Sequence, residues 1–183
     1  MVPEEIDVGA RELVLRRWCM TDAPRALAAV EASLPELRRF MPWAMEWPTL
    51  ESIGTFLQTV VSGATLGFGL FDASGELVGG FGLHDRRGPG ILEIGYWVRS
   101  DRTGRGYATA AAGALTRIAF ECFPLIHRIE IRCDPANLAS AAIPPKLGYR
   151  LERTDAVEVE AEDQTGKQQV WVLDRADREH PAP

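Results

Sequence analysis

A short turn rich in glycine and arginine is the segment of this chain best suited to bind an anion. Residues 100–106 read SDRTGRG; the apolar, β-forming stretch Ile91–Val98 precedes them, and an Ala-rich stretch with helical spacing, Tyr107–Glu121, follows them. A helix N-terminus presents free backbone N–H groups and the positive end of the helix dipole. Glycine lacks a Cβ atom and lets a phosphate approach the backbone closely. The spacing therefore predicts a phosphate site at Gly104 and Gly106.

The residues of this turn exclude two common kinds of phosphate site. The Gly-x-x-x-x-Gly-Lys-Ser/Thr spacing of nucleoside-triphosphate loops is absent. The three spaced glycines of a dinucleotide-binding βαβ unit, with an acidic residue about 20 positions later, are also absent. Arg102 and Arg105 add positive charge, which suits a phosphate-bearing ligand of another class.

A second polar segment, residues 137–149, carries groups that can donate or accept hydrogen bonds. Its sequence, NLASAAIPPKLGY, predicts a short helix from Asn137 to Leu147 that is closed by Gly148. Ser140 lies one helical turn after Asn137, on the same face of that helix. The sequence therefore places an amide and a hydroxyl close together.

The two segments together resemble the signatures of the GCN5-related N-acetyltransferases, the GNAT superfamily. The acyl-CoA pattern of that family, Arg/Gln-x-x-Gly-x-Gly/Ala, falls on residues 103–108 and matches at Gly106 and Ala108. The second signature, Asn-x-x-Ser…Lys-Leu-Gly-Phe, falls on residues 137–149. The N-terminal stretch LVLRRWCMTDA and residues 33–43 resemble the RimJ/RimL branch, which acetylates the N-termini of ribosomal proteins.

The resemblance implies that acetyl-CoA is the cofactor and that its phosphate arm lies on the turn. Thr103 departs from the usual Arg or Gln, so Arg102 or Arg105 is expected to supply that side-chain contact. The pantetheine arm is expected to pair along the preceding strand. The implied cofactor-binding residues are Trp97, Val98, Arg99, Arg102, Thr103, Gly104, Arg105, Gly106, Tyr107, Ala108, Thr109, Asn137 and Lys146.

The resemblance also implies direct attack of an amine on the thioester in a ternary complex. The developing oxyanion needs a fixed N–H donor, which the family takes from the strand backbone, here Trp97 or Val98. Many family members have a tyrosine where this chain has Pro144. Because proline cannot donate a proton, Ser140 is the candidate partner of the leaving thiolate.

Two further residues are candidates for catalysis, and each has a structural alternative. Glu93 lies on the strand before the turn and is the candidate general base, working through water; the alternative is a structural carboxylate. Asn137 is expected to help fix the active site and can also serve as a helix cap. Ser140 has an alternative too, that of a solvated helix-surface serine. Neither the cysteines nor the histidines suggest a metal site.

An aromatic cluster, FMPWAMEWP over residues 40–48, is the candidate lining of the acceptor pocket through Trp43 and Trp47. The alternative is a loop that closes the core.

A protein N-terminus suits the chemistry because an α-amine, with a pKa of about 7.7–8.0, is partly neutral near pH 7. Two other functions remain open: acetylation of a small amine, amino acid or antibiotic, and a non-catalytic acyl-CoA-binding regulatory module.

Composition is that of a globular protein and argues against some partners. The chain has 183 residues, 46% of them hydrophobic, and a net charge of −6, so nucleic acid is not an expected partner. No apolar run is long enough to span a bilayer. Residues 1–10 lack a signal-peptide pattern, and three scattered cysteines suit a reducing compartment, so a cytoplasmic location is expected. A homodimer is left open.

The order of predicted elements is one strand, three helices, three strands, a helix, a strand, a helix and two strands. This order predicts a single α/β (α+β) domain with a mixed, largely antiparallel sheet of about six or seven strands flanked by helices. It also matches the element order of the GNAT family. The expected boundaries are a flexible leader over residues 1–10, the domain over 11–175 and a loose tail over 176–183.

Overall fold

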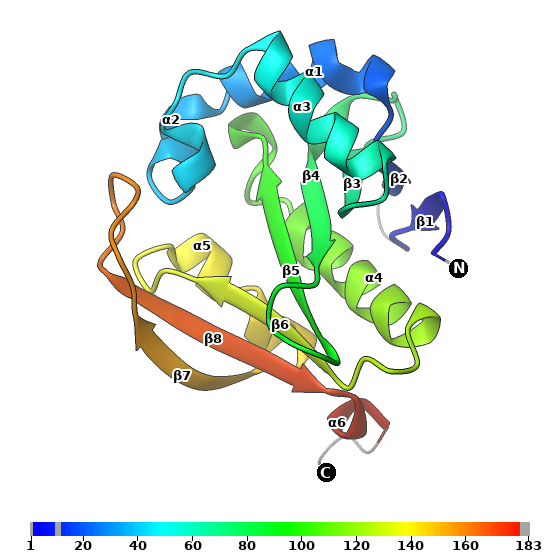
Figure 1. Cartoon of the computed structure of the whole chain (residues 1–183), viewed down its shortest axis with the longest axis vertical. Helices are drawn as coiled ribbons and strands as arrows, with labels where there is room; N and C mark the ends of the chain where they lie inside the picture. The colour runs from blue at the N-terminus through cyan, green and yellow to red at the C-terminus, as the bar shows by residue number, and fades with distance from the viewer. Residues whose placement is uncertain (1, 10–11, 180–183) are drawn as a thin grey trace.

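The computed structural model describes residues 2–9 and 12–179, which form one mixed sheet with helices on both of its faces (Figure 1). The strands are β1 Glu5–Asp7, β2 Val14–Arg17, β3 Leu66–Phe71, β4 Leu77–His84, β5 Ile91–Val98, β6 Arg128–Cys133, β7 Arg150–Ala156 and β8 Lys167–Asp174. The α-helices are α1 Ala23–Glu31, α2 Leu34–Arg38, α3 Leu50–Val61, α4 Tyr107–Cys122, α5 Leu138–Ala141 and α6 Arg175–Glu179. Short 3-10 helices are η1 Met20–Asp22, η2 Pro42–Ala44, η3 Ser100–Arg102 and η4 Pro144–Leu147.

The strands lie in the order β1-β2-β3-β4-β5-β6-β8-β7. All neighbouring strands run antiparallel except β5 and β6, which are parallel and are joined through α4. A parallel pair needs such a crossover, because its second strand must start at the same end of the sheet as the first. The predicted mixed, largely antiparallel sheet is therefore confirmed.

The sheet contains one strand more than the six or seven predicted, because Glu5–Asp7 pairs with β2. Ile6 is 2% exposed and lies opposite Leu15 in the ladder. The prediction of a flexible leader is therefore wrong for these three residues. A three-residue strand with one inward apolar side chain is too short to show a period in the sequence.

The other boundaries differ from prediction in small ways. Residues 10, 11 and 180–183, which include parts of the expected leader, first strand and tail, lie outside the described residues. The predicted single helix over 137–147 is instead α5 followed by η4. Pro144 and Pro145 explain this break, since proline has no N–H for the helical ladder and clashes with the preceding turn.

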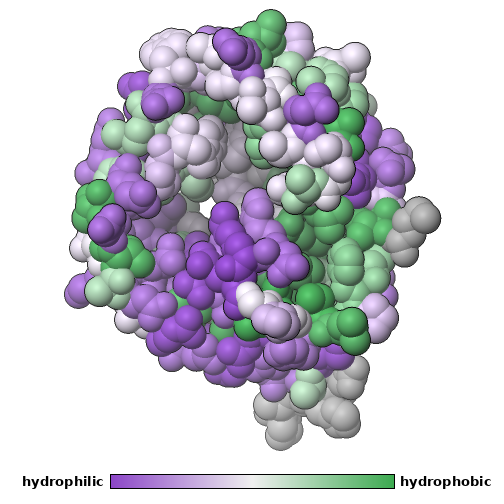
Figure 2. Space-filling view, in the orientation of Figure 1, coloured by the Kyte–Doolittle hydropathy of each residue, from purple (hydrophilic) through white to green (hydrophobic). Residues whose placement is uncertain are grey.

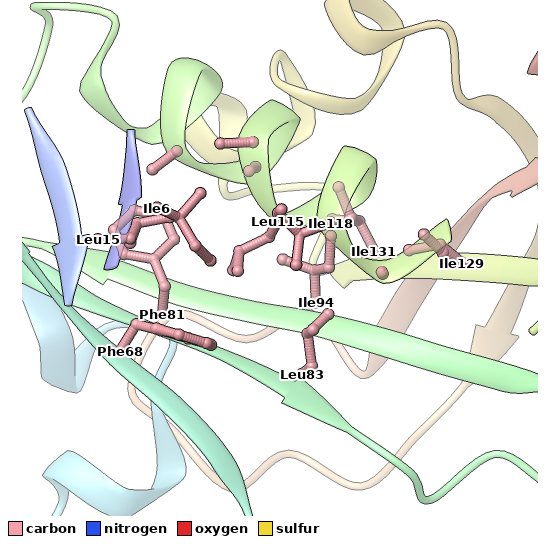
Figure 3. Packing of buried hydrophobic residues seen from close by; sticks show 14 of the residues in the cluster. Ile6, Leu15, Phe68, Phe81, Leu83, Ile94, Leu115, Ile118, Ile129 and Ile131 are labelled. Atoms are coloured by element: carbon pink, nitrogen blue, oxygen red, sulfur yellow. The ribbon is translucent and has the colours of Figure 1, made fainter. Parts of the chain in front are cut away.

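The main core lies between α4 and the sheet. Figure 3 shows Leu115 and Ile118 of α4 directed toward Ile94 of β5 and Ile131 of β6. Alanines make up much of the buried face of α4, including Ala111, Ala112 and Ala119, all fully buried. Such small side chains let a helix approach a sheet closely. This contact holds the turn before α4 at a defined position beside β5.

The N-terminal helices cover the opposite face at one end of the sheet (Figure 1). Trp18, Leu57 and Val60 pack there with residues of α1, β3 and β4. The loop between β7 and β8 reaches α2, where the Asp163 carboxylate accepts a hydrogen bond from Nε of Arg39 at 2.6 Å. Backbone N–H groups of this loop also donate to carbonyls of residues 38 and 39 at 3.2 and 2.8 Å. The β7–β8 loop and the end of α2 therefore lie side by side at one rim of this face.

We expect Leu115→Ala to lower the free energy of unfolding by about 2–5 kcal/mol, because Leu115 is 0% exposed and its removal leaves a cavity between α4 and the sheet. Urea denaturation measures this change. Leu125→Ala is the matched control: this leucine is 89% exposed, and its substitution should change stability by less than about 0.5 kcal/mol. Equal effects of the two substitutions would contradict the packing described here.

Candidate active site

The glycine turn between β5 and α4 adopts the conformation that an anion site needs. Gly104 and Gly106 have φ values of 72° and 79°, a region that favours glycine. A Cβ atom added at either glycine would have no other atom within 4 Å, so the space above both is open. Gly106 is also the N-cap residue of α4 and has no side chain to cap the helix. The turn thus leaves the helix N-terminus uncovered.

Several backbone N–H groups of this turn are available to a ligand. The first N–H bonded within α4 is that of Ala110, which donates to the carbonyl of Gly106 at 3.0 Å. Within the described part of the chain, the N–H groups of Gly104, Arg105 and Gly106 donate no hydrogen bond. Successive free amides beside the positive end of a 16-residue helix form an anion site.

The arginines near the turn differ in what they already bind. Arg102 forms an ion pair with Asp72 at 3.1 Å, and Arg99 donates to the carboxylate of Asp101 at 3.0 Å. Arg105 is exposed and donates only to the carbonyl of Asp101, at 3.3 Å. Of the two arginines proposed to replace the contact missing at Thr103, Arg105 is therefore better placed.

A groove of about 560 Å³ runs from this turn between α4 and η4. Thr109 and Lys146, both predicted to bind the cofactor, line it together with Gly106. Arg117 lines it as well and was not predicted. The sequence could have indicated Arg117, because Thr109, Gly113 and Arg117 follow one another at four-residue intervals and so share one face of the helix. Two cationic side chains thus extend the anion site along the helix.

Strands β5 and β6 part beside the turn. Their parallel ladder ends at the pair Ile94–Ile131, while β5 continues along β4 to Val98 and β6 continues along β8 to Cys133. One edge of β5 therefore has no neighbouring strand beyond Ile94. Its backbone groups on that edge need another partner.

The register identifies which backbone groups face this gap. The N–H of Arg99 donates to the carbonyl of Val78 at 2.9 Å, and antiparallel pairs alternate between bonded and non-bonded types. Trp97 therefore directs its N–H toward β4, whereas Tyr96 and Val98 direct theirs toward the gap. Of the predicted oxyanion donors, Val98 lies on the open edge and Trp97 does not. Tyr96 is the donor that sequence reasoning missed.

The residue Ser140 lies on the α4 side of the gap. Its Oγ atom is 3.0 Å from the hydroxyl oxygen of Tyr96, and its N–H donates to Oδ1 of Asn137 at 3.2 Å. Asn137 is thus the N-cap of α5, the structural alternative considered for it. Burial raises the pKa of Tyr96 to about 12, so its hydroxyl stays protonated near neutral pH. The pair Tyr96–Ser140 can therefore deliver a proton to a group in the gap.

Cys133 and His127 are unsuited to act together in nucleophilic catalysis. Burial raises the pKa of the Cys133 thiol to about 11, which disfavours the thiolate. His127 is exposed and lies near Gly90 at the start of β5. A Cys–His pair is therefore not formed.

Glu93 is not free to act as a general base. Its carboxylate is 6% exposed and is bonded by the guanidinium groups of both Arg86 and Arg87. Nε of Arg132 lies 3.7 Å from it. Burial alone raises the pKa of Glu93, but the hydrogen bonds and charges of Arg86 and Arg87 outweigh this effect and hold the pKa below its ordinary value. This geometry favours the structural alternative considered for Glu93 over the role of a general base.

The face of the sheet opposite α4 is hollowed at its centre, and hydrophilic residues gather along the lower edge of the hollow in Figure 2. Trp97 lies on this face and its ring centroid is 6.3 Å from that of Trp43. Trp43 and Trp47 are 51% and 64% exposed, and the guanidinium of Arg38 lies 5.8 Å from the Trp47 ring. The structure therefore brings Trp43 to β5 and leaves Trp47 at the surface. We call the face of the sheet opposite α4, which carries Trp97, the acceptor face, after the predicted role of Trp43 and Trp47.

We expect Glu93→Gln to lower stability by about 1.5–3 kcal/mol at pH 7, because an amide cannot replace the carboxylate between the arginines. Folding lowers the pKa of Glu93 from 4.5, so its contribution is present above pH 4.5 and is lost as pH falls through the lowered value. The variant should lose this part of the acid dependence in thermal unfolding. Glu158→Gln, at an exposed position, should leave both quantities unchanged.

Comparisons with known proteins agree with this geometry. A model of the acetyltransferase (GNAT) domain matches residues 12–150. A Bacillus subtilis protein described as a candidate ribosomal N-acetyltransferase, YdaF, is 38% identical over 60 residues. That segment is 33% of this chain and 32% of the relative, so it spans about a third of the relative's length.

Solved structures share the fold over nearly the whole chain. RimL, a ribosomal L7/L12 α-N-protein acetyltransferase in complex with coenzyme A, superposes with a TM-score of 0.84 at 20% identity, covering 93% of this chain and 98% of that one. Mycobacterium smegmatis RimJ, in complex with a CoA-disulfide, gives 0.80 at 27% identity, covering 93% and 84%. The microcin C7 self-immunity acetyltransferase MccE, with acetyl-CoA and AMP, gives 0.83 at 18%, covering 94% and 97%. By the match to its domain model, this chain belongs to the GNAT acetyltransferase family.

Proposed function

We propose that this chain transfers the acetyl group of acetyl-CoA to a primary amine, and that the N-termini of proteins are its acceptors. One observation carries the proposal: β5 parts from β6 beside a turn in which the N–H groups of Gly104, Arg105 and Gly106 have no partner among the described residues. An extended chain with amide groups fits the open edge of β5, and a diphosphate fits the turn. Pantetheine and the diphosphate of acetyl-CoA have this chemistry in this order.

The residues present fit that cofactor along its length. Free amides at Gly104 and Gly106 would hold the diphosphate, with Arg105 beside them. The groove with Arg117 and Lys146 would take the nucleotide end, where cations suit a further phosphate. Acetyl-CoA supplies the thioester, and every other group named here belongs to the chain.

The groups at the gap suit acyl transfer. The N–H groups of Tyr96 and Val98 point into it and can stabilise the negative charge that develops on the thioester oxygen. The hydroxyl of Ser140 can protonate the leaving thiolate and recover a proton through Tyr96, 3.0 Å away, which regains its own from water. The structure and the family thus support the same direct transfer without a covalent enzyme intermediate.

Two observations support protein N-termini as the acceptors: the descriptions of similar solved structures and the aromatic side chains on the acceptor face. Among those structures, RimL is described as a ribosomal L7/L12 α-N-protein acetyltransferase, and a Vibrio fischeri structure as a ribosomal-protein-S5-alanine acetyltransferase. On the face opposite α4, the exposed ring of Trp43 and the ring of Trp97 offer an apolar contact for the first side chain of a peptide. An α-amine, with a pKa of about 7.7–8.0, reaches the thioester already partly neutral.

We expect Gly106→Val to abolish measurable binding of acetyl-CoA, because a β-branched side chain is strained at a φ of 79° and occupies the space above the amides. Isothermal calorimetry measures the affinity. Gly63→Val is the matched control, since Gly63 has a φ of 81° and equally open surroundings after α3. Similar losses of affinity in both variants would show that backbone strain, and not the site, is responsible.

We expect Ser140→Ala to lower kcat about 10²-fold, at the low end of the range for loss of a general acid, with the affinity for acetyl-CoA unchanged. The leaving thiol has a pKa of about 8.5, so it departs slowly but not negligibly without a proton donor. Release of thiol, followed with a disulfide reagent, measures kcat. An unchanged kcat would exclude Ser140 as the proton donor.

The acceptor itself is tested by incubating a proteome and a panel of small amines with the enzyme and isotopically labelled acetyl-CoA. Mass spectrometry should find the label on protein N-termini. Label on small amines alone would replace the acceptor class with that alternative. Absence of any thiol release despite tight binding of acetyl-CoA would favour the non-catalytic acyl-CoA-binding module.

A further inference from the structure

Glycines form part of the acceptor face of β4 and β5. In the antiparallel register Gly82 lies opposite Gly95, and Gly80 lies opposite Trp97. Residues paired in this way share a face of the sheet, and their neighbours Phe81, Ile94 and Tyr96 pack toward α4. The glycines therefore leave room on this face, beside Tyr96, for the side chains of neighbouring residues.

The imidazole of His84, the last residue of β4, lies across this glycine pair. A methyl group added at Gly82 would be 3.0 Å from Nε2 of His84, and one added at Gly95 would be 3.1 Å from the same atom. Both distances are shorter than an ordinary van der Waals contact, so any larger residue at either position would push the ring away. The glycine pair thus provides the space that the ring occupies.

Both nitrogens of this ring remain open. The imidazole of His84 makes no hydrogen bond or ion pair within the described part of the chain. The same residues contain no buried side-chain nitrogen or oxygen without a partner. Since His84 is half-buried and its nitrogens lack partners, they must be reached from solvent. An imidazole held against the sheet with accessible nitrogens can exchange protons with a bound molecule.

The charges around His84 come from three directions. Arg86 and Arg87 follow it in the turn after β4, Glu93 lies opposite it on β5, and Arg132 approaches Glu93 from β6 at 3.7 Å. Burial lowers the pKa of His84 below 6.5, Arg86 and Arg87 lower it further, and Glu93 opposes them. Because both arginines are bonded to Glu93, the imidazole is left without an anionic partner of its own.

From this geometry we infer that His84 is the catalytic base, which takes a proton at Nε2 from the ammonium form of the acceptor. This inference rests on the proposed function, and His84 lies outside both sequence signatures. Glu93, the carboxylate on the same face, is bonded by two arginines and cannot approach an amine. Of these two titratable side chains on that face, His84 is the one with an accessible lone pair.

The protons balance over the cycle. His84 takes one proton from the ammonium, which leaves a neutral amine whose lone pair forms the C–N bond as the C–S bond breaks. The nitrogen of the tetrahedral adduct loses a second proton to water. The departing thiolate gains a proton from Ser140, which is hydrogen-bonded to Tyr96 at 3.0 Å, and this pair regains its proton from water. The imidazolium then releases its proton to water. His84 lies on the Gly95 face of the sheet and the Tyr96 side chain points to the other face, so the proton acceptor and the proton donor lie on opposite sides of the sheet.

The test compares the pH dependence of kcat for the wild-type enzyme and His84→Gln, with a peptide that has a free N-terminal alanine as acceptor. The kcat profile reports groups in the enzyme–substrate complex. The wild-type profile should fall on the acid side below pH 6.5, as the lowered pKa of His84 requires. In His84→Gln this limb should move up to the pKa of the amine, about 7.7–8.0, and kcat at pH 7 should fall about 10²-fold.

His127→Gln is the matched control, since it makes the same exchange at an exposed position at the start of β6. It should match the wild-type enzyme. Calorimetry with acetyl-CoA should give unchanged affinity for both variants, which excludes a folding defect as the cause of a lower kcat. A His84→Gln enzyme with wild-type kcat and an unmoved acid limb would overturn the inference.

A second variant keeps His84 but changes the position of its ring. Gly95→Ala should lower kcat while the affinity for acetyl-CoA is retained, because its methyl group displaces Nε2. An unchanged kcat would contradict the placement.

If the wild-type enzyme releases thiol with neither the peptide nor small amines, the proposed function fails and His84 loses its role with it. If the wild type is active and both variants match it, only the inference about His84 fails.

Discussion

The organisation of this protein depends on a hydrogen-bond ladder that stops before its strand does. Beyond Ile94, β5 has β4 on one edge and no strand on the other. Unpaired backbone groups at the centre of a sheet are unfavourable unless water or a ligand satisfies them. A cofactor with amide groups can satisfy them, and the edge thereby becomes a binding site that needs no specialised side chain. The turn that follows offers the same kind of group, because the N–H groups of Gly104, Arg105 and Gly106 are also unpaired among the described residues.

Packing around α4 keeps that edge open. The Ala-rich face of the helix lies close to β5 and β6, and Leu115 and Ile118 fill the space between them. This contact fixes the start of α4, and with it the turn, relative to the end of the parallel ladder. On the far side the loop between β7 and β8 is bonded to Arg39, so the acceptor face has a fixed rim. Both ligands are thus positioned by elements whose own stability comes from the core.

Side-chain alternation along β5 divides the chemistry between two faces. Tyr96 points toward α4 and Ser140, while Glu93 and Trp97 point toward the acceptor face. Three arginines surround the Glu93 carboxylate. A buried carboxylate with such partners is stabilised as an ion and is a poor proton acceptor. The ion pairs of Glu93 therefore stabilise β5 on this face, and only side chains without an ion-pair partner are suited to transfer protons.

Local patterns by themselves determined most of the elements, including the turn and the helix to which the cofactor is proposed to bind. The glycines at 104 and 106 and the alanines of the following helix predict a turn and a helix start from short-range physics, and the structure has both. The resemblance to GNAT signatures rests on the same local segments, and the family match over residues 12–150 agrees with it.

Tertiary structure decided which side chains are free to react. Glu93, His84 and Arg102 each carry a suitable group, but residues distant in sequence or on neighbouring strands determine whether that group is already bonded. Arg102 is held by Asp72, thirty positions away, and Glu93 by the turn after the preceding strand. His84 faces glycines whose significance depends on the pairing of β4 with β5. Reactivity depends on burial and on partners in space, and a linear pattern specifies neither until the strands have paired.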